Sequence, residues 1–380
     1  MRILLAAEAP LGAGGSGAER VLDGHVAALR ARGHRLMVLC RAGERPRGDD
    51  VTVRPIGWSA LTPWRARTAA RAEIARRELD AIVLYHPLPG ALLAAVARRA
   101  GIPVLAFVLS PWAEEYAARA STNGARHRAS FGVRRRLEAR VLGRARRVCA
   151  LSRFMADRIA ATHGLPASVM RVIPGGVDRA RFAPAGDRRA VRGRLGLPLD
   201  GPLLFCLRNL EPRMGVELLL DALPAVLARH PSAVLVVGGD GPLAPTLRAH
   251  AARLGFGAAV RFAGFVPEDA LPAYYAAADV SVVPTRHLEG FGLVTLESLA
   301  CGTPVIGTPV GATPEVLAPL DPTLLADAVT ADALARALLT FFARGDHDAL
   351  ATRCRAHTEA YAWDRVAAQI EGELEALRAR

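Results

Sequence analysis

Short apolar runs alternate with amphipathic helical segments along the first half of the chain. The runs contain few polar residues and end at glycine, proline or charged positions, as buried parallel strands do. They cover residues 3–7, 36–40, 81–85, 104–109, 148–151 and 171–173. Helical patterns fill most of the intervals between them, so this half predicts a doubly wound parallel α/β sheet.

The second half repeats the pattern with apolar runs at residues 203–207, 233–238, 260–263, 280–284 and 305–307. A passage rich in proline, glycine and arginine, residues 174–202, predicts an interdomain linker with one short helix. A chain of 380 residues is also too long for one ordinary core. We therefore expect two Rossmann-like domains, 1–180 and 181–360, that face each other and bind ligands at the carboxyl ends of their strands.

Residues 289–315, EGFGLVTLESLACGTPVIGTPVGATPE, combine a glycine-rich loop with a helix. Gly290, Phe291 and Gly292 precede a helical pattern of leucines. Glycines let backbone amides approach a ligand closely, and a helix N-terminus favours an anion such as phosphate. Two carboxylates, Glu289 and Glu297, would lie roughly 12 Å apart if the interval were helical throughout. That separation suits the two ends of a nucleotide sugar, whereas the pair taken alone is more typical of an unrelated surface residue and helix residue.

Glycines also crowd the loop between the first strand and the first helix, residues 12–17. In isolation this is the weak fingerprint of a dinucleotide-binding loop. A dehydrogenase also needs an acid at the end of the second strand to hold the ribose, but that strand ends Cys40-Arg41. An NAD(P)-dependent enzyme is therefore the weaker alternative, for which Arg41 leaves room if the dinucleotide is phosphorylated.

Two arginines follow the first strand of the second half, Arg208 directly and Arg213 beside the next helix. Such a pair could clamp a diphosphate from both sides, and solvated arginines are the alternative. The next strand runs into a second glycine turn that includes Gly239. After the third strand, Phe265 and Val266 stand where backbone groups could meet a nucleobase edge.

The composition is that of a globular protein, with 51% hydrophobic and 22% charged residues. All 49 basic residues are arginine, and the formal net charge is +13. Ten arginines fall within residues 119–147, including the Arg134 to Arg147 region. A solvated helix face is the favoured interpretation, and contact with an anionic membrane surface is the alternative. Stacking aromatics do not interleave these arginines, so nucleic-acid binding is not supported.

Five widely spaced cysteines form neither a CxxC motif nor a zinc spacing, which favours reduced structural thiols. The first residues are typical of a strand rather than of a signal peptide. The uncharged run 81–97 is interrupted by prolines and glycine, which indicates a strand, a turn and a helix rather than a membrane span. We expect a cytoplasmic protein, with peripheral contact at the inner face of the membrane as the alternative.

Several motifs, in this order and spacing, resemble the GT-B retaining glycosyltransferases of family 4 over nearly the whole chain. They are GAER at 17–20, ARGHRLMVL at 31–39, LSRFMADRI at 151–159, VIPGGVD at 172–178 and the 289–315 block. The resemblance implies an acceptor-binding N-terminal domain and a donor-binding C-terminal domain. It also implies a final helix, residues 361–380, that crosses back onto the N-terminal domain with Trp363 fixing it there.

The resemblance also implies roles for single residues. Glu289 would contact the transferred sugar, and Glu297 the nucleotide ribose. Backbone amides of Gly290, Phe291, Gly292, Leu293 and Val294 would hold the sugar and the diphosphate. Gly15 and Gly17 would approach the donor phosphates or the acceptor.

The chain departs from the family pattern at three positions. Asn209 and Met214 stand where the family usually has Arg and Lys for the diphosphate, with Arg208 and Arg213 one position earlier in each case. Leu109 stands where a family histidine normally lies beside the reacting sugar. His86, at the end of the preceding strand, is a candidate substitute, and a structural core histidine is the equal alternative.

We therefore expect a retaining glycosyltransferase that moves a hexose or N-acetylhexosamine from a nucleoside diphosphate sugar, UDP before GDP, to a hydroxyl acceptor. A glycan, a lipid carrier or a small product such as an aminocyclitol would supply that hydroxyl. No metal or organic cofactor is expected, because arginines and amides would neutralise the diphosphate. A pyridoxal-phosphate enzyme is excluded, since the chain has no lysine for a Schiff base. A catalytically silent paralogue that binds the sugar nucleotide is the alternative.

Overall fold

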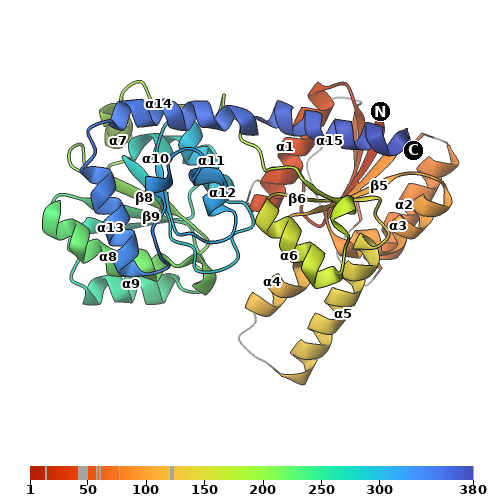
Figure 1. The fold of residues 1–380 in the computed structure, drawn as a ribbon, viewed down its shortest axis with the longest axis horizontal. Coiled ribbons are helices and arrows are strands. Elements are labelled where there is room, and N and C mark those ends of the chain that lie inside the picture. Colours follow the sequence, from red (N-terminus) through yellow and green to blue (C-terminus); the bar gives the residue numbers. More distant parts are fainter. Residues whose placement is uncertain are drawn as a thin grey trace. The chain divides into compact units, whose positions relative to one another are not determined.

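The structure is a computed structural model that describes residues 1–380 except 13–14, 42–49, 57–58, 60, 77, 120–123 and 380. It divides into two compact units (Figure 1). Unit 1 comprises Met1–Gly175 and Trp363–Arg380, and unit 2 comprises Gly176–Ala362. The chain thus passes from one unit to the other a few residues before position 180 and a few residues after position 360.

Unit 1 is built on a seven-stranded sheet in the order β3-β2-β1-β4-β5-β6-β7. Every pair of neighbouring strands is parallel. The central strands read as continuous apolar runs because helices cover both faces; Ile3, Leu4 and Leu5 are completely buried. In chain order the strands are β1 (Arg2–Ala6), β2 (Arg35–Cys40), β3 (Val51–Pro55), β4 (Ala81–Leu84), β5 (Val104–Val108), β6 (Arg147–Ala150) and β7 (Met170–Val172).

The helices of unit 1 lie on both faces of its sheet (Figure 1). On one face, Ala66, Leu93 and Val141 belong to a core that also contains Leu4 and Leu84 from the sheet. These three residues come from α2, α3 and α5. The helices in the described residues are α1 (Gly17–Ala31), α2 (Thr62–Ala75), α3 (Pro87–Arg99), α4 (Trp112–Arg119), α5 (Ala125–Leu142), α6 (Arg153–His163) and α15 (Trp363–Arg378), with a 3₁₀ turn η1 (Ala167–Val169).

The last helix, α15, lies along α1 within unit 1. Trp363 opens it and covers Gly24 so closely that a Cβ there would come within 2.3 Å of the indole. The same indole meets His25 edge-on, with ring centroids 5.6 Å apart. His25 is completely buried, its Nδ1 is 2.7 Å from the Tyr85 hydroxyl, and burial lowers its pKa to about 3. A neutral imidazole and a glycine together make the surface that receives Trp363.

Unit 2 is built on a five-stranded parallel sheet in the order β10-β9-β8-β11-β12. Strand β8 is central and pairs with β9 on one side and with β11 on the other. The order of the strands therefore reverses at β8. Ligands bind at such a switch point, outside the carboxyl ends of the strands. The strands are β8 (Leu203–Leu207), β9 (Val234–Gly238), β10 (Val260–Gly264), β11 (Val280–Val283) and β12 (Val305–Gly307).

Helices α8 and α13 lie against each other in unit 2, and α10, α11 and α14 form a second group. The described helices are α7 (Arg188–Arg194), α8 (Val216–Arg229), α9 (Ala244–Arg253), α10 (Leu271–Ala277), α11 (Leu293–Ala300), α12 (Thr313–Leu317), α13 (Ala331–Phe342) and α14 (His347–His357). Four 3₁₀ turns accompany them: η2 (Pro212–Met214), η3 (Gly257–Ala259), η4 (Pro322–Leu324) and η5 (Thr358–Tyr361).

The predicted fold class, two doubly wound parallel α/β sheets, is confirmed. Each predicted run corresponds to a strand, and the one short helix of the passage 174–202 is α7. Strand β3 was not predicted. It lies at the edge of the sheet, pairs only with β2, and has just two buried valines, Val51 and Val53, before Arg54 and Pro55. Such a short run lacks the apolar pattern of a central strand.

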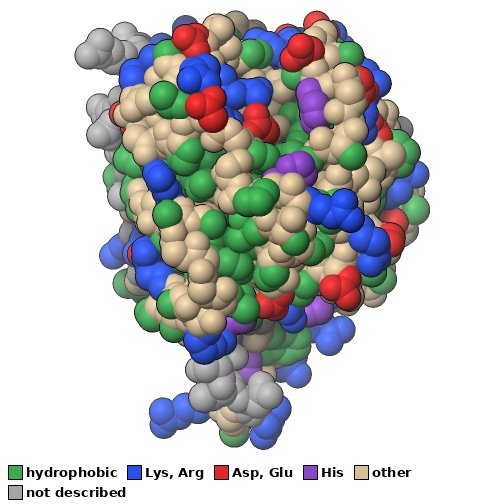
Figure 2. All heavy atoms as spheres, turned by 90° about the vertical axis from the view of Figure 1, so that its left-hand side faces the viewer, with side chains coloured by type: hydrophobic (Ala, Val, Ile, Leu, Met, Phe, Trp, Pro, Cys, Tyr) green, Lys and Arg blue, Asp and Glu red, His purple; other side chains and the backbone are tan. Residues whose placement is uncertain are grey.

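All five cysteines are buried thiols, and none of them forms a disulfide with another described residue. Burial raises the pKa of the Cys206 thiol to about 12, so this thiol is protonated at neutral pH. Among the described residues, no helix is both long enough and apolar enough to cross a membrane. Figure 2 shows basic and acidic side chains interspersed over one face of the molecule rather than a single basic patch there.

Candidate donor-binding site

Arg208, Thr285 and Glu289 meet at the carboxyl ends of two neighbouring strands of unit 2. Arg208 directly follows β8, while Thr285 and Glu289 follow β11. Arg208 Nη2 donates to Glu289 Oε2 and, over 2.6 Å, to Thr285 Oγ1. The Thr285 hydroxyl in turn donates to the same Glu289 oxygen over 2.8 Å. All three residues are buried, with Arg208 6% and Glu289 8% exposed.

This network keeps Glu289 ionised. Burial alone would raise the pKa of the carboxyl, but the charge and hydrogen bond of Arg208, together with the hydrogen bond from Thr285, lower it below its usual value. Only Oε2 is engaged; Oε1 makes no hydrogen bond to the residues that the structure describes. An ionised carboxylate with one oxygen held and the other available is suited to accept hydrogen bonds from sugar hydroxyls.

Glycines bring neighbouring backbone segments against this network. Gly311 follows β12 with a φ of +61°, and a Cβ there would come within 2.1 Å of the Glu289 carbonyl oxygen. The same carbonyl accepts a hydrogen bond of 3.0 Å from the Ala312 amide. Gly215, at the start of α8, approaches Pro284 equally closely. The position of Glu289 is therefore fixed from both its side chain and its backbone.

Arg213 holds the loop that leads to Glu289. Its Nη1 donates to the Leu288 carbonyl over 3.2 Å, and its Nε lies 3.5 Å from Glu211 Oε2. Leu288 has a φ of +55° and is the one non-glycine residue with positive φ in the described part of the chain. Such a conformation costs about 1–3 kcal/mol and occurs most often at functional sites. Arg213 therefore supports a strained segment beside the carboxylate.

The helix N-terminus that follows is not capped by any side chain. Gly292 takes the cap position in the left-handed conformation, with a φ of +83°, and offers no side-chain oxygen. The Thr295 amide donates to the Gly292 carbonyl, whereas no acceptor within the described residues takes the Leu293 and Val294 amides. Free amides at a helix N-terminus form a ready site for an anion.

Glu297 is on the buried side of α11 and is 3% exposed. Its Oε2 accepts a hydrogen bond of 2.9 Å from the Tyr275 hydroxyl. Phe291 is also buried, with its ring 6.0 Å from that of Tyr361. Gly290 lies between Glu289 and Phe291 in the same loop.

Four other predicted donor residues surround this site in unit 2. Asn209 is exposed at the end of β8. Gly239 approaches Arg208 so closely that a Cβ would lie 2.0 Å from its carbonyl oxygen, and its amide donates to the Gly264 carbonyl. Phe265 is 68% exposed, whereas Val266 is buried. The Gly239 amide is thus already used by the protein, whereas the side chains of Asn209 and Phe265 are open to a ligand.

Two contacts of Arg208 were not predicted from the sequence. Thr285 is completely buried, and its only sequence signal is a polar residue just past an apolar strand. The Met214 sulfur lies 3.0 Å from Arg208 Nη2. Arg208 was expected to face a diphosphate, but the structure shows it paired with Glu289.

The predicted phosphate loop of unit 1 begins a capped helix. Ser16 accepts from the Glu19 amide, and Glu19 Oε2 accepts from the Gly15 amide over 2.6 Å and from the Ser16 amide over 3.1 Å. The Gly15 amide is therefore occupied by the protein itself. A Cβ on Gly17 would meet nothing within 4 Å. Two further residues of this loop, Ala13 and Gly14, lie outside the described residues.

His86 caps α3 in unit 1. Its Nδ1 accepts from the Leu88 amide over 3.1 Å, which leaves the proton on Nε2, 2.9 Å from Glu8 Oε2. The imidazole also meets the Trp112 ring edge-on. These contacts give His86 a structural role at the carboxyl end of β4. Leu109 follows β5 and is half-buried.

Within the described residues, no group of three or more His, Cys, Asp or Glu could hold a metal ion.

The sequence model of Glycosyltransferase Family 4 matches residues 15–181, and that of Glycosyl transferases group 1 matches residues 187–359. The chain is 34% identical over 275 residues to the GDP-mannose-dependent alpha-(1-6)-phosphatidylinositol monomannoside mannosyltransferase of Mycolicibacterium smegmatis, covering 70% of this chain and 68% of that protein. The chain belongs to glycosyltransferase family 4.

A second family 4 relative is the D-inositol 3-phosphate glycosyltransferase of Acidothermus cellulolyticus, 35% identical over 254 residues. That alignment covers 63% of this chain and 56% of the relative, so the chain spans little more than half of its length. Family membership also settles one of the alternatives that were left open. The chain is a glycosyltransferase, and the weaker expectation of an NAD(P)-dependent enzyme is wrong.

Solved structures confirm the GT-B fold predicted for this family 4 member. Sucrose-phosphate synthase from Thermosynechococcus elongatus superposes with a TM-score of 0.80 at 23% identity, covering 100% of this chain and 99% of that one. Anabaena HepE in complex with UDP and glucose superposes with a TM-score of 0.77 at 21% identity, covering 98% and 99%. Because both identities are below 25%, this similarity shows the fold alone.

Proposed function

We propose that this glycosyltransferase moves a hexosyl group from a nucleoside diphosphate sugar to a hydroxyl acceptor with retention at the anomeric carbon. The observation that supports the proposal most is the position of Glu289. One of its oxygens is held by buried Arg208 and Thr285, and the uncapped start of α11 follows within the same loop. An ionised carboxylate beside an anion site matches a sugar joined to a diphosphate.

We assign the sugar to Glu289 Oε1 and the diphosphate to the Leu293 and Val294 amides. Arg208 keeps Glu289 ionised and in place, while Arg213 adds positive charge beside the loop. As the bond to the leaving diphosphate breaks, these amides and cations would stabilise the negative charge that develops there. Such preorganised groups favour the transition state over the ground state.

We assign the ribose to Glu297, as the family resemblance implies. The hydrogen bond from Tyr275 engages Oε2 and orients the carboxylate on α11. Replacing Tyr275 by Phe removes that bond without removing the ring. We expect Tyr275→Phe to weaken nucleotide binding and to leave turnover at saturating donor nearly unchanged, as measured by calorimetry and steady-state kinetics. Equal affinity in both proteins would contradict this role of the pair.

The donor nucleotide carries either uracil or guanine as its base. The sequence favoured UDP over GDP, whereas the relative in Mycolicibacterium smegmatis is named as GDP-mannose-dependent. We therefore place UDP and GDP sugars side by side in the first test. Release of the nucleotide from GDP-mannose, UDP-glucose and UDP-N-acetylglucosamine would identify the donor, and the anomeric configuration of the product, determined by NMR, tests retention.

For the acceptor we propose a hydroxyl on a cyclitol. The names of both relatives contain inositol, once as a phosphate and once within a phosphatidylinositol mannoside. D-inositol 3-phosphate, an aminocyclitol and phosphatidylinositol mannosides should be offered in parallel with each donor. Acceptor-dependent nucleotide release with any of them supports the proposal, and release only with unrelated glycans contradicts it.

We also propose that the Arg134 to Arg147 region makes peripheral contact with an anionic membrane. Arg135, Arg136 and Arg140 of α5 are exposed. Arg134 instead stacks over Tyr116 at 3.8 Å, and Val133 is 62% exposed. The exposed face is thus basic with little apolar surface, which favours electrostatic contact over insertion. Flotation with liposomes that contain phosphatidylinositol tests this, and equal recovery with neutral liposomes would exclude it.

A catalytically silent protein that binds the sugar nucleotide is the second candidate. It is favoured by Asn209, Met214 and Leu109, which replace groups that the family usually uses at the diphosphate and the sugar. The two candidates differ in one measurement. Calorimetric binding of a donor without turnover in any acceptor mixture favours the silent protein, and nucleotide release favours the enzyme.

A further inference from the structure

Unit 2 contains a pocket of about 460 Å³ that shares no residue with the donor-binding site. Its volume lies within the range typical of small-molecule sites. The walls come from the segment before α7, from α7, α10 and α14, and from the residues directly after α11. The lining residues are Arg179, Pro184, Ala185, Arg188, Ala276, Cys301, Gly302, Ala351, Thr352, Arg355, Ala356 and Glu359.

Small apolar residues form most of this lining, which is why space remains between the elements. Four alanines, a proline and a glycine surround the cavity. The Cys301 thiol is buried, and burial raises its pKa to about 12, so it contributes an apolar, neutral group. The body of a ligand in this pocket would therefore be apolar.

Two arginines in the same pocket have no carboxylate partner. Arg355 Nη2 donates to the Arg179 carbonyl over 2.9 Å, and Arg179 Nη2 donates to the Arg355 carbonyl over 3.4 Å. Within the described residues, the acceptors of both guanidiniums are backbone carbonyls rather than carboxylates, and Arg179 Nε is buried without any hydrogen-bond partner. Burial and the neighbouring Arg179 charge lower the pKa of Arg355. An anion between the two would relieve this repulsion.

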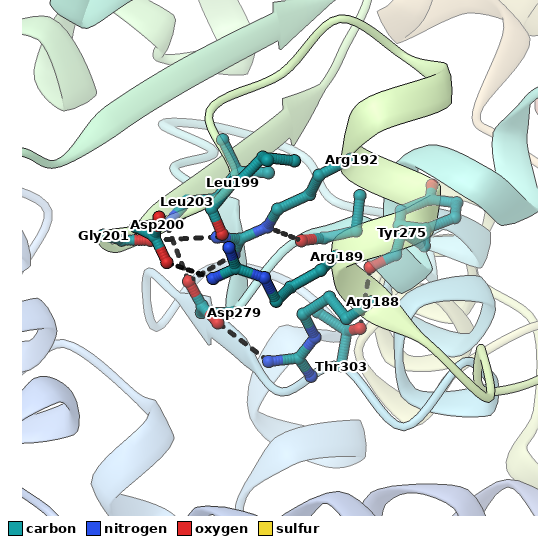
Figure 3. Close-up of polar contacts among 11 residues, drawn as sticks. Arg188, Arg189, Arg192, Leu199, Asp200, Gly201, Leu203, Tyr275, Asp279 and Thr303 are labelled. Atoms are coloured by element: carbon teal, nitrogen blue, oxygen red, sulfur yellow. Dashed lines mark hydrogen bonds and ion pairs between the residues drawn. The ribbon is translucent and has the colours of Figure 1, made fainter.

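The third arginine, Arg188, is already compensated. Its Nη1 lies 2.8 Å from Asp279 Oδ1, and the other oxygen of Asp279 binds buried Arg192 over 2.8 Å (Figure 3). Arg192 also donates to the Ala277 carbonyl, which fixes α7 on the body of unit 2. Arg188 therefore forms part of the wall, and the uncompensated charge belongs to Arg179 and Arg355.

We propose that this pocket binds a phosphate monoester with a compact apolar body, such as a ring. Two guanidiniums match the double charge of a phosphate monoester and can each donate two parallel hydrogen bonds to it. The small apolar lining takes the body. Glu359 stands at the exposed rim, where it selects against ligands with additional negative charge.

The pocket also adjoins the helix of the donor-binding site. Arg355 Nη1 donates to the Ala300 carbonyl, the last residue of α11, and to the Phe182 carbonyl over 2.8 Å. A phosphate at Arg355 would compete for the same guanidinium that binds the C-terminal end of α11. A ligand here would thus act on the helix whose N-terminus we assign to the donor diphosphate.

Isothermal titration with phenyl phosphate tests the site directly. Inorganic phosphate and phenol serve as the two halves of the probe. All titrations contain a saturating concentration of the nucleoside diphosphate, UDP or GDP, that binds the donor-binding site. We expect one equivalent of phenyl phosphate to bind at least tenfold more tightly than either half. No binding of phenyl phosphate at millimolar concentration would overturn the proposal.

Two variants locate the binding. Arg179→Gln removes one uncompensated charge, and Ala351→Leu fills the apolar part of the pocket. Each change should weaken the binding of phenyl phosphate at least tenfold. The matched control is Arg336→Gln on α13, an exposed arginine paired with Asp327 outside the pocket, which should bind as the unaltered protein does. Far-UV circular dichroism checks folding, and either pocket variant alone suffices if the other does not fold.

Arg213→Gln distinguishes the pocket from the donor-binding site. The variant should retain phenyl phosphate binding, because Arg213 does not line the pocket. Loss of binding only in Arg213→Gln, or unchanged binding in Arg179→Gln and Ala351→Leu, would show that the probe occupies the donor-binding site and would overturn the proposal. Binding of phenyl phosphate to this pocket does not depend on turnover. A catalytically silent protein should therefore bind it equally well.

Discussion

Two glycine-rich loops in this protein lead into helices, and the two helix starts differ in which groups satisfy their amides. At α1, the Ser16 side chain and the Glu19 carboxylate form a capping box, and Glu19 also takes the Gly15 amide. At α11, Gly292 has no side chain to offer, and the Leu293 and Val294 amides have no acceptor within the described residues. Similar sequence patterns thus produce one satisfied helix start and one that is open to an anion.

The comparison also shows where the protein stores strain. The open helix start follows Leu288, which has a positive φ. Its glycine N-cap also lacks a side-chain hydrogen bond, which costs roughly a few tenths of a kcal/mol relative to a serine or aspartate cap. The buried network of Arg208, Thr285 and Glu289 and the contact from Arg213 offset these costs. In unit 1, Asp23 Oδ1 accepts from the Gly12 amide over 2.9 Å, and the capping box of Ser16 and Glu19 satisfies the helix start directly. Strain and polar support together are the reasons for which we propose the unit 2 loop as the donor-binding loop.

The largest expected effect is on turnover. Glu289→Gln removes the negative charge beside the sugar and leaves buried Arg208 without its counter-charge, so we expect nucleotide release to fall by about 10²–10³-fold. The assay is release of the nucleotide from the preferred donor. Asp327→Asn, an exposed carboxylate elsewhere in unit 2, is the matched control and should retain full activity. Full activity in Glu289→Gln would remove this residue from the mechanism.

Stability in acid provides a second test of the same carboxylate. The folded-state pKa of Glu289 lies below its usual value of 4.5. The ionised carboxylate therefore adds stability above about pH 5, and this contribution is lost as the pH falls through 4.5 towards the lowered folded-state pKa. Urea unfolding at pH 7 and pH 4 should show a gap between the unaltered protein and Glu289→Gln that narrows in acid. A gap of constant size would contradict the lowered pKa.

Alanine at the two glycines sharpens the comparison. Gly292→Ala forces a side chain into a left-handed conformation, so we expect a loss of about 1–2 kcal/mol in the free energy of unfolding, together with weaker donor binding. Gly17→Ala meets no neighbouring atom and should stabilise the protein by roughly 0.4–1 kcal/mol. Urea unfolding measures both. Equal destabilisation by the two changes would mean that the helix starts do not differ as described.

The smallest expected effect concerns the capped helix. Ser16→Ala removes the side-chain cap of α1 and should lower the free energy of unfolding by about 1 kcal/mol. Donor affinity should stay unchanged, because we assign the diphosphate to α11. Thermal unfolding and calorimetry give the two values. A loss of donor affinity comparable to that of Gly292→Ala would move the phosphate site to unit 1.

The sequence was sufficient for all the described strands except the edge strand β3, because buried parallel strands show as continuous apolar runs. It was also sufficient for the start of α11, where glycines precede a leucine pattern. It could not predict the pairing of Arg208 with Glu289, since the two residues lie on different strand ends and meet only when β8 and β11 become neighbours. The cap of α1 differs in this respect, because Ser16 and Glu19 have the S-x-x-E spacing of a capping box and were readable from the sequence, although this role was not predicted.

The most direct test of the central claim is a crystal structure of the protein with a bound nucleoside diphosphate, either UDP or GDP. We predict that a phosphate oxygen accepts hydrogen bonds from the Leu293 and Val294 amides of α11. A diphosphate bound instead at the start of α1, with Glu19 displaced, would contradict the account.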